Sequence, residues 1–196
     1  MAPPEVKTGV VLLAAGLGKR FGGGKLTAKF RGRPLWEWAA RTAESLDFRE
    51  YILVRGPKSP IRSCPGWRLV ENPVAEKGMG SSIAVGVGAL TDSDRVIIML
   101  ADMPFVSRAH LSQLMARRGV GFTQHPDGVP GCPAIFPKPA FAELEGLTGE
   151  QGARSLDFDE TFLVSPADSR ELADIDTVRD LEKLASEPDK IAPLPR

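Results

Sequence analysis

Residues 10–25 read VVLLAAGLGKRFGGGK. Four consecutive apolar residues that stop at Ala-Ala-Gly are typical of a fully buried strand in a parallel sheet. The segment after Leu13 is rich in glycine, lysine and arginine, and it is predicted to be a loop that continues to about Arg33. Pro34 is then expected to open a helix that runs to about Leu46, because proline is well tolerated at the first helical position.

Strand and helix patterns alternate along the rest of the chain. Strands are predicted at residues 51–54, 67–70, 95–100, 120–123, 133–136 and 161–164, and helices at 78–90, 107–118 and 176–184. Ser107 is the expected cap of the second of these helices, and Asp176 or Thr177 of the third. The alternation predicts a single α/β domain with a doubly wound, mostly parallel sheet. Ligands of such folds bind beyond the carboxyl ends of the strands, so the loops after Leu13 and Leu100 are the candidate sites.

Length and composition limit the possible functions. The 196 residues suit one domain, which we expect to span residues 1–185, with a disordered, proline-containing tail at 186–196. The formal net charge of zero gives no general attraction to nucleic acid or to a membrane surface. There are only two cysteines, and neither a signal peptide nor an apolar run of about 18 residues is apparent. These features favour a cytoplasmic protein.

The glycine-rich loop suits a polyphosphate. Glycines let backbone N–H groups approach a ligand closely, and Arg20 and Lys25 add cationic donors. A solvated loop with ordinary surface charges is the alternative. A P-loop would need glycine in place of Lys19 and a hydroxyl residue in place of Leu26. A dinucleotide fingerprint would need glycine in place of Phe21, so a hydride-transfer enzyme is disfavoured.

Several segments, in the right order, resemble motifs of the MobA-like nucleotidyltransferase family, and within it the molybdenum cofactor cytidylyltransferases. They are residues 13–25, 32–35, 72–73 with 78–83, 101–104, 128–136, 149–154, and 174–177 with 180–181. The resemblance covers about residues 8–185 and implies a Rossmann-like fold of the nucleotide-diphospho-sugar transferase type. The chain departs from the family pattern at Phe21, where Met is common, and at Cys132, where His is frequent.

The resemblance also implies an activity: Mg²⁺-dependent transfer of CMP from CTP to the phosphate of a molybdopterin-type cofactor, with release of pyrophosphate. A molybdoenzyme or its chaperone would be a possible partner. The implied catalytic residues are Arg20, Lys25 and Asp102, and Asp102 is the implied Mg²⁺ ligand. The implied nucleotide-binding residues are Leu13, Ala14, Ala15, Gly16, Gly18, Gly22, Lys25, Gly78 and Ser82. The implied acceptor-binding residues are Gly131, Cys132, Pro133, Arg154 and Asp176.

Each of these assignments has a structural alternative. Asp102 could simply form a turn, and Asp176 could cap the last helix or bind a second metal. Ser82 could serve close helix packing, and Arg154 a surface salt bridge. Cys132 is interpreted as a packing residue and not a nucleophile.

His110 is expected on the surface of its helix and His125 in a loop, and neither has partners at metal-ligand spacing. No histidine is needed as a base, because an acceptor phosphate is already ionised at neutral pH. Two other functions stay open. One is transfer of a different nucleotide to a different acceptor, although guanylyltransferases of this kind place glycines where Ala14 and Ala15 stand. The other is a non-catalytic cofactor carrier, against which the joint presence of Lys25 and Asp102 argues.

Overall fold

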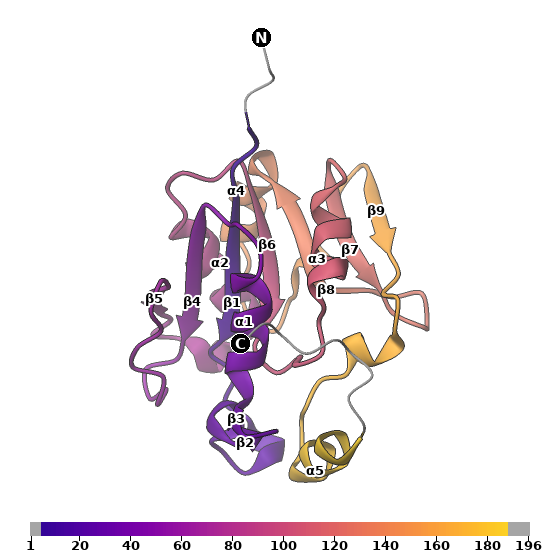
Figure 1. The fold of residues 1–196 in the computed structure, drawn as a ribbon. Coiled ribbons are helices and arrows are strands. Elements are labelled where there is room, and N and C mark those ends of the chain that lie inside the picture. The colour runs from indigo at the N-terminus through magenta and orange to yellow at the C-terminus, as the bar shows by residue number, and fades with distance from the viewer. Residues whose placement is uncertain (1–4, 188–196) are drawn as a thin grey trace.

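Strand β1 (Thr8–Ala14) has all of its residues buried, as its apolar run predicts. The computed structural model describes residues 5–187, and β1 lies within their seven-stranded sheet, whose order is β5-β4-β1-β6-β8-β7-β9 (Figure 1). The other strands are β4 (Glu50–Arg55), β5 (Arg68–Glu71), β6 (Arg95–Leu100), β7 (Val120–Gln124), β8 (Pro130–Pro137) and β9 (Thr161–Val164). Only β8 runs against its neighbours, β6 and β7, and the remaining pairs are parallel. The predicted mostly parallel sheet is confirmed.

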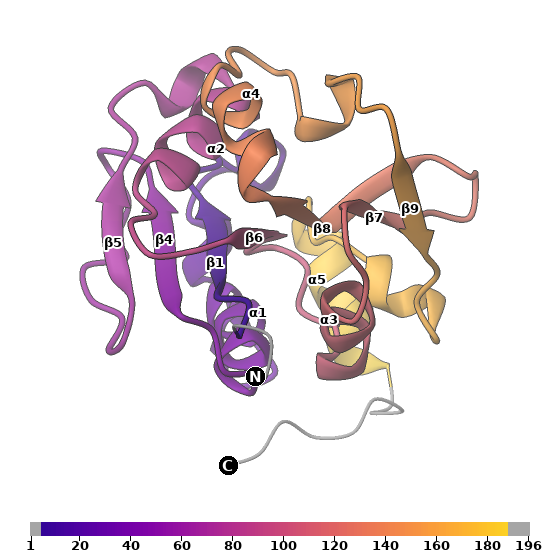
Figure 2. The same ribbon diagram turned by 90° about the horizontal axis from the view of Figure 1, so that it is seen from above.

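Helices cover both faces of this sheet. Successive side chains of β1 point to opposite sides and are apolar, so both faces must be buried. Val10 and Leu12 pack with α1 (Leu35–Glu44) and α3 (Arg108–Met115), whereas Val11 and Leu13 pack with α2 (Met79–Gly88) and α4 (Phe141–Glu145). Figure 2 shows these two helical layers on either side of the strands. Helix α5 (Val178–Ser186) follows the last strand of the sheet, β9. The fold is therefore the doubly wound α/β domain expected.

A third apolar cluster lies at the carboxyl edge of the sheet. The small hairpin of β2 (Lys29–Phe30) and β3 (Arg33–Pro34) and helix α5 all lie at this edge (Figure 1), and the cluster joins Phe30 of the hairpin to Ile175 of the segment before α5, both fully buried. The Arg31 guanidinium donates hydrogen bonds to the carbonyls of Leu184 and Glu187, at 2.9 and 2.7 Å, and so ties the hairpin to the end of α5. These contacts hold the glycine-rich loop and the segment before α5 over the ends of β1 and β6.

Some boundaries differ from those predicted. Helix α1 begins at Leu35 with Pro34 as the residue before it, and α3 ends at Met115 instead of continuing to about residue 118. Thr177, not Asp176, caps α5: its hydroxyl accepts from the Asp180 amide, whose carboxylate in turn accepts from the Thr177 amide. The predicted disordered tail begins with a helical residue, since Ser186 ends α5, and residues 188–196 lie outside the described residues.

The largest error concerns His110. It is only 2% exposed, because the side of α3 that carries it faces β7, so the predicted surface position is wrong. Ser107 caps α3 as predicted, accepting from the His110 amide. Within residues 5–187, none of the helices has the length and apolar character needed to cross a membrane.

Candidate active site

Three segments that are far apart in the sequence meet at the carboxyl ends of β1 and β6. The amide of Ala101, just after β6, donates to the Leu13 carbonyl at 3.1 Å. The amide of Ile175, before α5, donates to the Asp102 carbonyl at 3.0 Å. Asp102 is therefore held between the strand that precedes the glycine-rich loop and the segment that carries Asp176.

The glycine-rich loop folds back so that Lys25 points into the protein. Gly18, Gly22, Gly23 and Gly24 all have positive φ values, between 55° and 95°, which glycine adopts at little cost. A Cβ at Gly18 would lie 3.0 Å from the Cβ of Lys25, so the two backbones approach closely. As a result Lys25 is only 8% exposed, which is unusual for a lysine.

Lys25 lies between two carboxylates. Its Nζ is 2.7 Å from Oδ2 of Asp102 and 3.1 Å from Oδ1 of Asp176. Burial acts to lower the pKa of Lys25, but the charges and hydrogen bonds of Asp102 and Asp176 outweigh it and raise the pKa above its ordinary value. Arg20 completes the cluster from the surface, with its guanidinium 2.7 Å from Oδ2 of Asp176. All three residues predicted as catalytic are thus brought together, and Asp176 joins them.

This cluster has features that suit a divalent cation. Oδ1 of Asp102 is buried and accepts no hydrogen bond within residues 5–187, so one oxygen lacks a partner at the centre of the site. Burial, together with the charges of Asp176 and Asp102, raises the pKa of Asp174 above its ordinary value. The part of the chain that the structure describes holds no ready set of three metal-ligating side chains. The donors therefore fit Mg²⁺, which commonly takes one or two carboxylates and completes its shell with phosphate oxygens and water.

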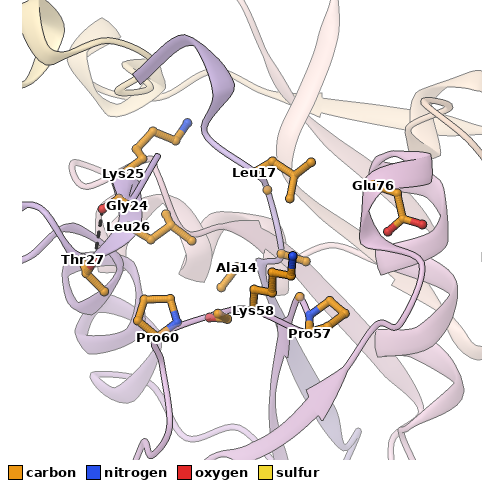
Figure 3. A pocket seen from close by; sticks show the side chains of 14 residues that line it. Ala14, Leu17, Gly24, Lys25, Leu26, Thr27, Pro57, Lys58, Pro60 and Glu76 are labelled. Carbon is orange, nitrogen blue, oxygen red and sulfur yellow. Dashed lines mark hydrogen bonds between the residues drawn. The ribbon is translucent and has the colours of Figure 1, made fainter. Parts of the chain in front are cut away.

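Two cavities flank Leu17 and share it as a wall. The first, of about 360 Å³, contains Arg20, Lys25, Asp102 and Asp176 in its lining and extends to Gly78 and Ser82. The second, of about 380 Å³, lies toward the loop after β4; Figure 3 shows it with Lys25 and Thr27 on one side, Glu76 on the other, and Lys58 nearby. Both volumes are in the range of small-molecule sites. Of the residues predicted to bind nucleotide, Leu13, Ala15, Gly16, Gly18, Lys25, Gly78 and Ser82 line the first and Ala14 the second, whereas Gly22 lines neither.

The far end of the first cavity is built on Asn72, which is fully buried. Its Nδ2 donates to the hydroxyls of Ser81 and Ser82, each at 2.9 Å. Ser81 donates onward to the Gly78 carbonyl, but the hydroxyl hydrogen of Ser82 finds no protein acceptor within residues 5–187. A buried hydroxyl at a cavity wall is thus free to donate to a ligand.

The start of α2 is shaped by a close approach of two backbones. Gly78 has a φ of 120°, and a Cβ there would lie 2.4 Å from the Gly149 carbonyl oxygen. The Gly80 amide donates to that same carbonyl at 2.9 Å. The glycine turn at 149 therefore packs on α2 and brings Glu150 to the cavity wall.

The residues predicted to bind the acceptor lie at different places. Asp176 lines the first cavity, whereas Gly131, Cys132, Pro133 and Arg154 line neither. Burial and the charge of Asp102 raise the pKa of the Cys132 thiol to about 12, so the thiol is neutral, as expected of a packing residue.

Several lining residues were not predicted from the sequence. Glu76, Met79 and Glu150 line the first cavity, and Lys58 the second. Glu76 and Glu150 gave no signal, because acidic residues next to an expected phosphate site look unfavourable. Asp174 lies in one of the family-like motifs, and its closeness to Asp176 was the available hint.

The chain shares sequence similarity with a known family and with several known proteins. The profile of the MobA-like NTP transferase domain matches residues 10–181. The purine catabolism protein PucB of Bacillus subtilis (strain 168) is 31% identical over 185 residues, which cover 85% of this chain and 90% of PucB. Nicotine blue oxidoreductase of Paenarthrobacter nicotinovorans is 34% identical over 116 residues, 57% of each chain.

Among solved structures, Rv0371c of Mycobacterium tuberculosis H37Rv has a TM-score of 0.79 at 24% identity, covering 94% of this chain and 100% of that one. The complex of Rv0371c with manganese has a TM-score of 0.73 at 22% identity, covering 92% and 98%. At such identities these likenesses establish the fold alone.

Proposed function

Because the chain belongs to the MobA-like NTP transferase family, we propose that it transfers CMP from CTP to the phosphate of a molybdopterin-type cofactor, using Mg²⁺ and releasing pyrophosphate. The observation that carries the proposal is the Lys25 ammonium, buried between Asp102 and Asp176 at the end of a glycine-rich loop. A nucleotidyltransferase needs a cation for the triphosphate beside carboxylates for a metal, and here they are in contact.

The site residues divide this work among them. Arg20, Lys25 and the amides of the glycine-rich loop neutralise the β- and γ-phosphates, while Asp102 and Asp176 hold Mg²⁺. When bound, Mg²⁺ would supply positive charge that offsets the negative charge developing on the leaving pyrophosphate. An oxygen of the acceptor phosphate attacks the α-phosphorus, and the bond between the α-phosphorus and the bridging oxygen to the β-phosphate breaks. The attacking oxygen carries no proton at neutral pH, so no histidine is required as a base.

The preference for CTP rests on Ala14, Ala15 and Ser82. The methyl groups of the two alanines leave less room at the loop entrance than the glycines of guanylyl-transferring relatives would. The free hydrogen of the buried Ser82 hydroxyl is suited to a cytosine carbonyl or ring nitrogen. Polar pairing discriminates strongly, because the wrong base leaves buried groups without partners.

The acceptor site is proposed at residues 131–133 and Arg154. Arg154 is exposed, so its guanidinium is available to an anionic acceptor. Cytoplasmic location and delivery of the product to a molybdoenzyme or its chaperone complete the proposal.

The experiment is incubation of the purified protein with CTP, Mg²⁺ and molybdenum cofactor, followed by mass measurement of the product and assay of pyrophosphate. The expected result is a cytosine dinucleotide form of the cofactor and stoichiometric pyrophosphate. Product from GTP at an equal rate, or turnover only with a sugar phosphate, would replace the proposed substrates. Oxidation of NADH or NADPH without release of pyrophosphate would instead favour an oxidoreductase. That class is considered because the chain is similar to nicotine blue oxidoreductase.

A further inference from the structure

Both histidines of the chain lie against residues 131–133, although neither takes part in the proposed chemistry. His125 follows β7, and its ring occupies the space beside Gly131, where a Cβ would lie 2.2 Å from Nε2. His110 reaches the same segment from α3 through Thr123. Two histidine side chains therefore restrain the conformation of residues 131–133.

The segment is a bulge in the sheet. Between β7 and β8, Phe122 pairs with Ala134 and the next residue, Thr123, pairs with Gly131. Cys132 and Pro133 therefore have no opposite residue on β7. Bulges often occur next to active sites, where they redirect a strand.

A chain of buried hydrogen bonds fixes this bulge. The Thr123 hydroxyl donates to the Pro133 carbonyl at 2.6 Å, and Nε2 of His110 is 2.7 Å from the same hydroxyl oxygen. Since the threonine hydrogen is used on Pro133, Nε2 of His110 must carry the hydrogen and donate. Thr123 is fully buried and His110 is 2% exposed, so water cannot replace either contact.

The protonation state of the His110 imidazole is also fixed by its surroundings. Its Nδ1 is buried and has no partner within residues 5–187. Burial lowers the pKa of His110 in spite of an opposing effect from Glu171, so the ring is neutral at physiological pH. The ring can therefore act as a fixed donor to Thr123.

The bulge leads toward the charged cluster. Strand β8 pairs with β6 from Arg95 opposite Pro137 to Ile98 opposite Ala134. Because the two strands are antiparallel, the residues before Ala134 continue toward the carboxyl end of β6, which Asp102 follows, and the charge of Asp102 acts on the Cys132 thiol. This path puts Cys132 and Pro133 beside the position at which the proposed acceptor phosphate must meet the nucleotide.

We propose that His110 and Thr123 are positioning residues for acceptor recognition, which hold the Cys132–Pro133 bulge in the shape that the acceptor requires. The proposal rests on the proposed function for the identity of the acceptor. It adds a way in which the protein distinguishes one acceptor from another. His110, a buried donor on α3, fixes the shape of the acceptor-site wall through Thr123 without touching the substrate.

The test compares loss and retention of the two hydrogen bonds. His110→Leu and Thr123→Val remove them, whereas Thr123→Ser keeps the hydroxyl and His110→Gln keeps a donor at similar reach. Thr42→Val is the matched control, because the buried Thr42 hydroxyl also donates to a backbone carbonyl, that of Val106 at 3.1 Å. The measurements are KM for molybdenum cofactor, KM for CTP, kcat, and hydrogen exchange of peptides covering residues 125–136.

We expect His110→Leu and Thr123→Val to raise the acceptor KM about tenfold, with the CTP KM within about twofold of the parent protein. Exchange at residues 129–134 should become faster, while Thr123→Ser, His110→Gln and Thr42→Val stay close to the parent. An unchanged exchange rate in this segment, or equal increases in both KM values, would overturn the proposal. If the parent protein does not use molybdenum cofactor, the proposed substrate fails, and the exchange measurement still decides whether His110 and Thr123 hold the bulge. If Thr123→Val does not fold, the comparison of His110→Leu with His110→Gln decides, because these two variants differ in whether a donor to Thr123 is kept.

Discussion

Lys25 is the residue on which the site depends. Its ammonium pairs with Asp102 and Asp176, the carboxylates proposed to hold the metal. Triphosphate binding would draw Lys25 toward the phosphates and release those carboxylates for Mg²⁺. Metal and nucleotide should therefore assist each other's binding, as two ligands do when each removes a group that obstructs the other.

The first prediction concerns Asp102→Asn. The change keeps the shape of the side chain and removes the charge and one oxygen that would hold the metal. We expect turnover to fall by about a hundredfold or more, since loss of one preorganised electrostatic group commonly costs this much. Circular dichroism should show an intact fold, and Mn²⁺ binding in the presence of CTP, followed by electron paramagnetic resonance, should be lost. Near-normal turnover with Mg²⁺ would remove Asp102 from the metal site.

The second prediction concerns Lys25→Ala. Although Lys25 belongs to a glycine-rich loop, it is nearly buried and paired with two carboxylates. Its removal leaves Asp102 partly buried without a cation, and we expect a loss of about 1–3 kcal/mol. Mn²⁺ should recover part of that loss and should bind the variant without CTP more tightly than it binds the parent protein.

Thermal melting with and without Mn²⁺ tests this, with Lys58→Ala, an exposed lysine of the second cavity, as the control. A Lys25→Ala protein as stable as Lys58→Ala, and indifferent to Mn²⁺, would show that the pairing with Asp102 and Asp176 is unimportant.

At the scale of elements, helix α3 shows why buried polar contacts escape sequence patterns. Its eight residues, Arg108–Met115, contain too few turns for a reliable apolar face, and His110 is buried because β7 lies beneath it. The site shows the same limit. The loops after β1 and β6 could be predicted, because a buried strand that ends at glycine or aspartate is a local signal. The position of Glu150 at the wall of the first cavity could not be predicted in this way. It depends on the packing of Gly149 on Gly78, a contact between distant parts of the chain.

The third prediction follows from α3 and concerns pH. The pKa of His110 is lowered in the folded protein from an ordinary value of 6.5. Between the folded and the unfolded pKa, the unfolded chain binds more protons, so the free energy of unfolding falls as pH drops below about 6.5. The slope contributed by this histidine is at most about 1.4 kcal/mol per pH unit. His110→Gln should lose that contribution.

Urea unfolding of the two proteins at pH 7.5, 6.5 and 5.5 provides the measurement, because other titrating groups cancel in the difference between them. Equal slopes below pH 6.5 would mean that His110 titrates alike in the folded and unfolded states.

At the scale of the whole molecule, the site exists only when the chain is folded. The hydrogen bonds of Lys25 join it to Asp102, 77 residues away, and to Asp176, 151 residues away. The first cavity also draws on β1, the start of α2 and the turn that carries Glu150. A ligand that fills it must bind the native protein far better than the unfolded chain, and must therefore stabilise it.

The last prediction uses that coupling to identify the nucleotide. At a hundred times its Kd, CTP should stabilise the protein by about 2.7 kcal/mol, equivalent to a rise of about 5–10 °C in Tm for a chain of this size. Because Lys25 cannot pair with phosphate and shield the carboxylates at once, CTP with Mg²⁺ should raise the Tm by more than the separate effects of CTP with EDTA and of Mg²⁺ alone. GTP with Mg²⁺ should give a smaller rise, since a purine would meet the methyl groups of Ala14 and Ala15 and would not match Ser82. In Asp102→Asn the extra effect of the metal should disappear while the response to CTP with EDTA remains. Equal shifts with GTP and CTP would refute the base preference, and strictly additive effects of CTP and Mg²⁺ would refute the exchange of partners at Lys25.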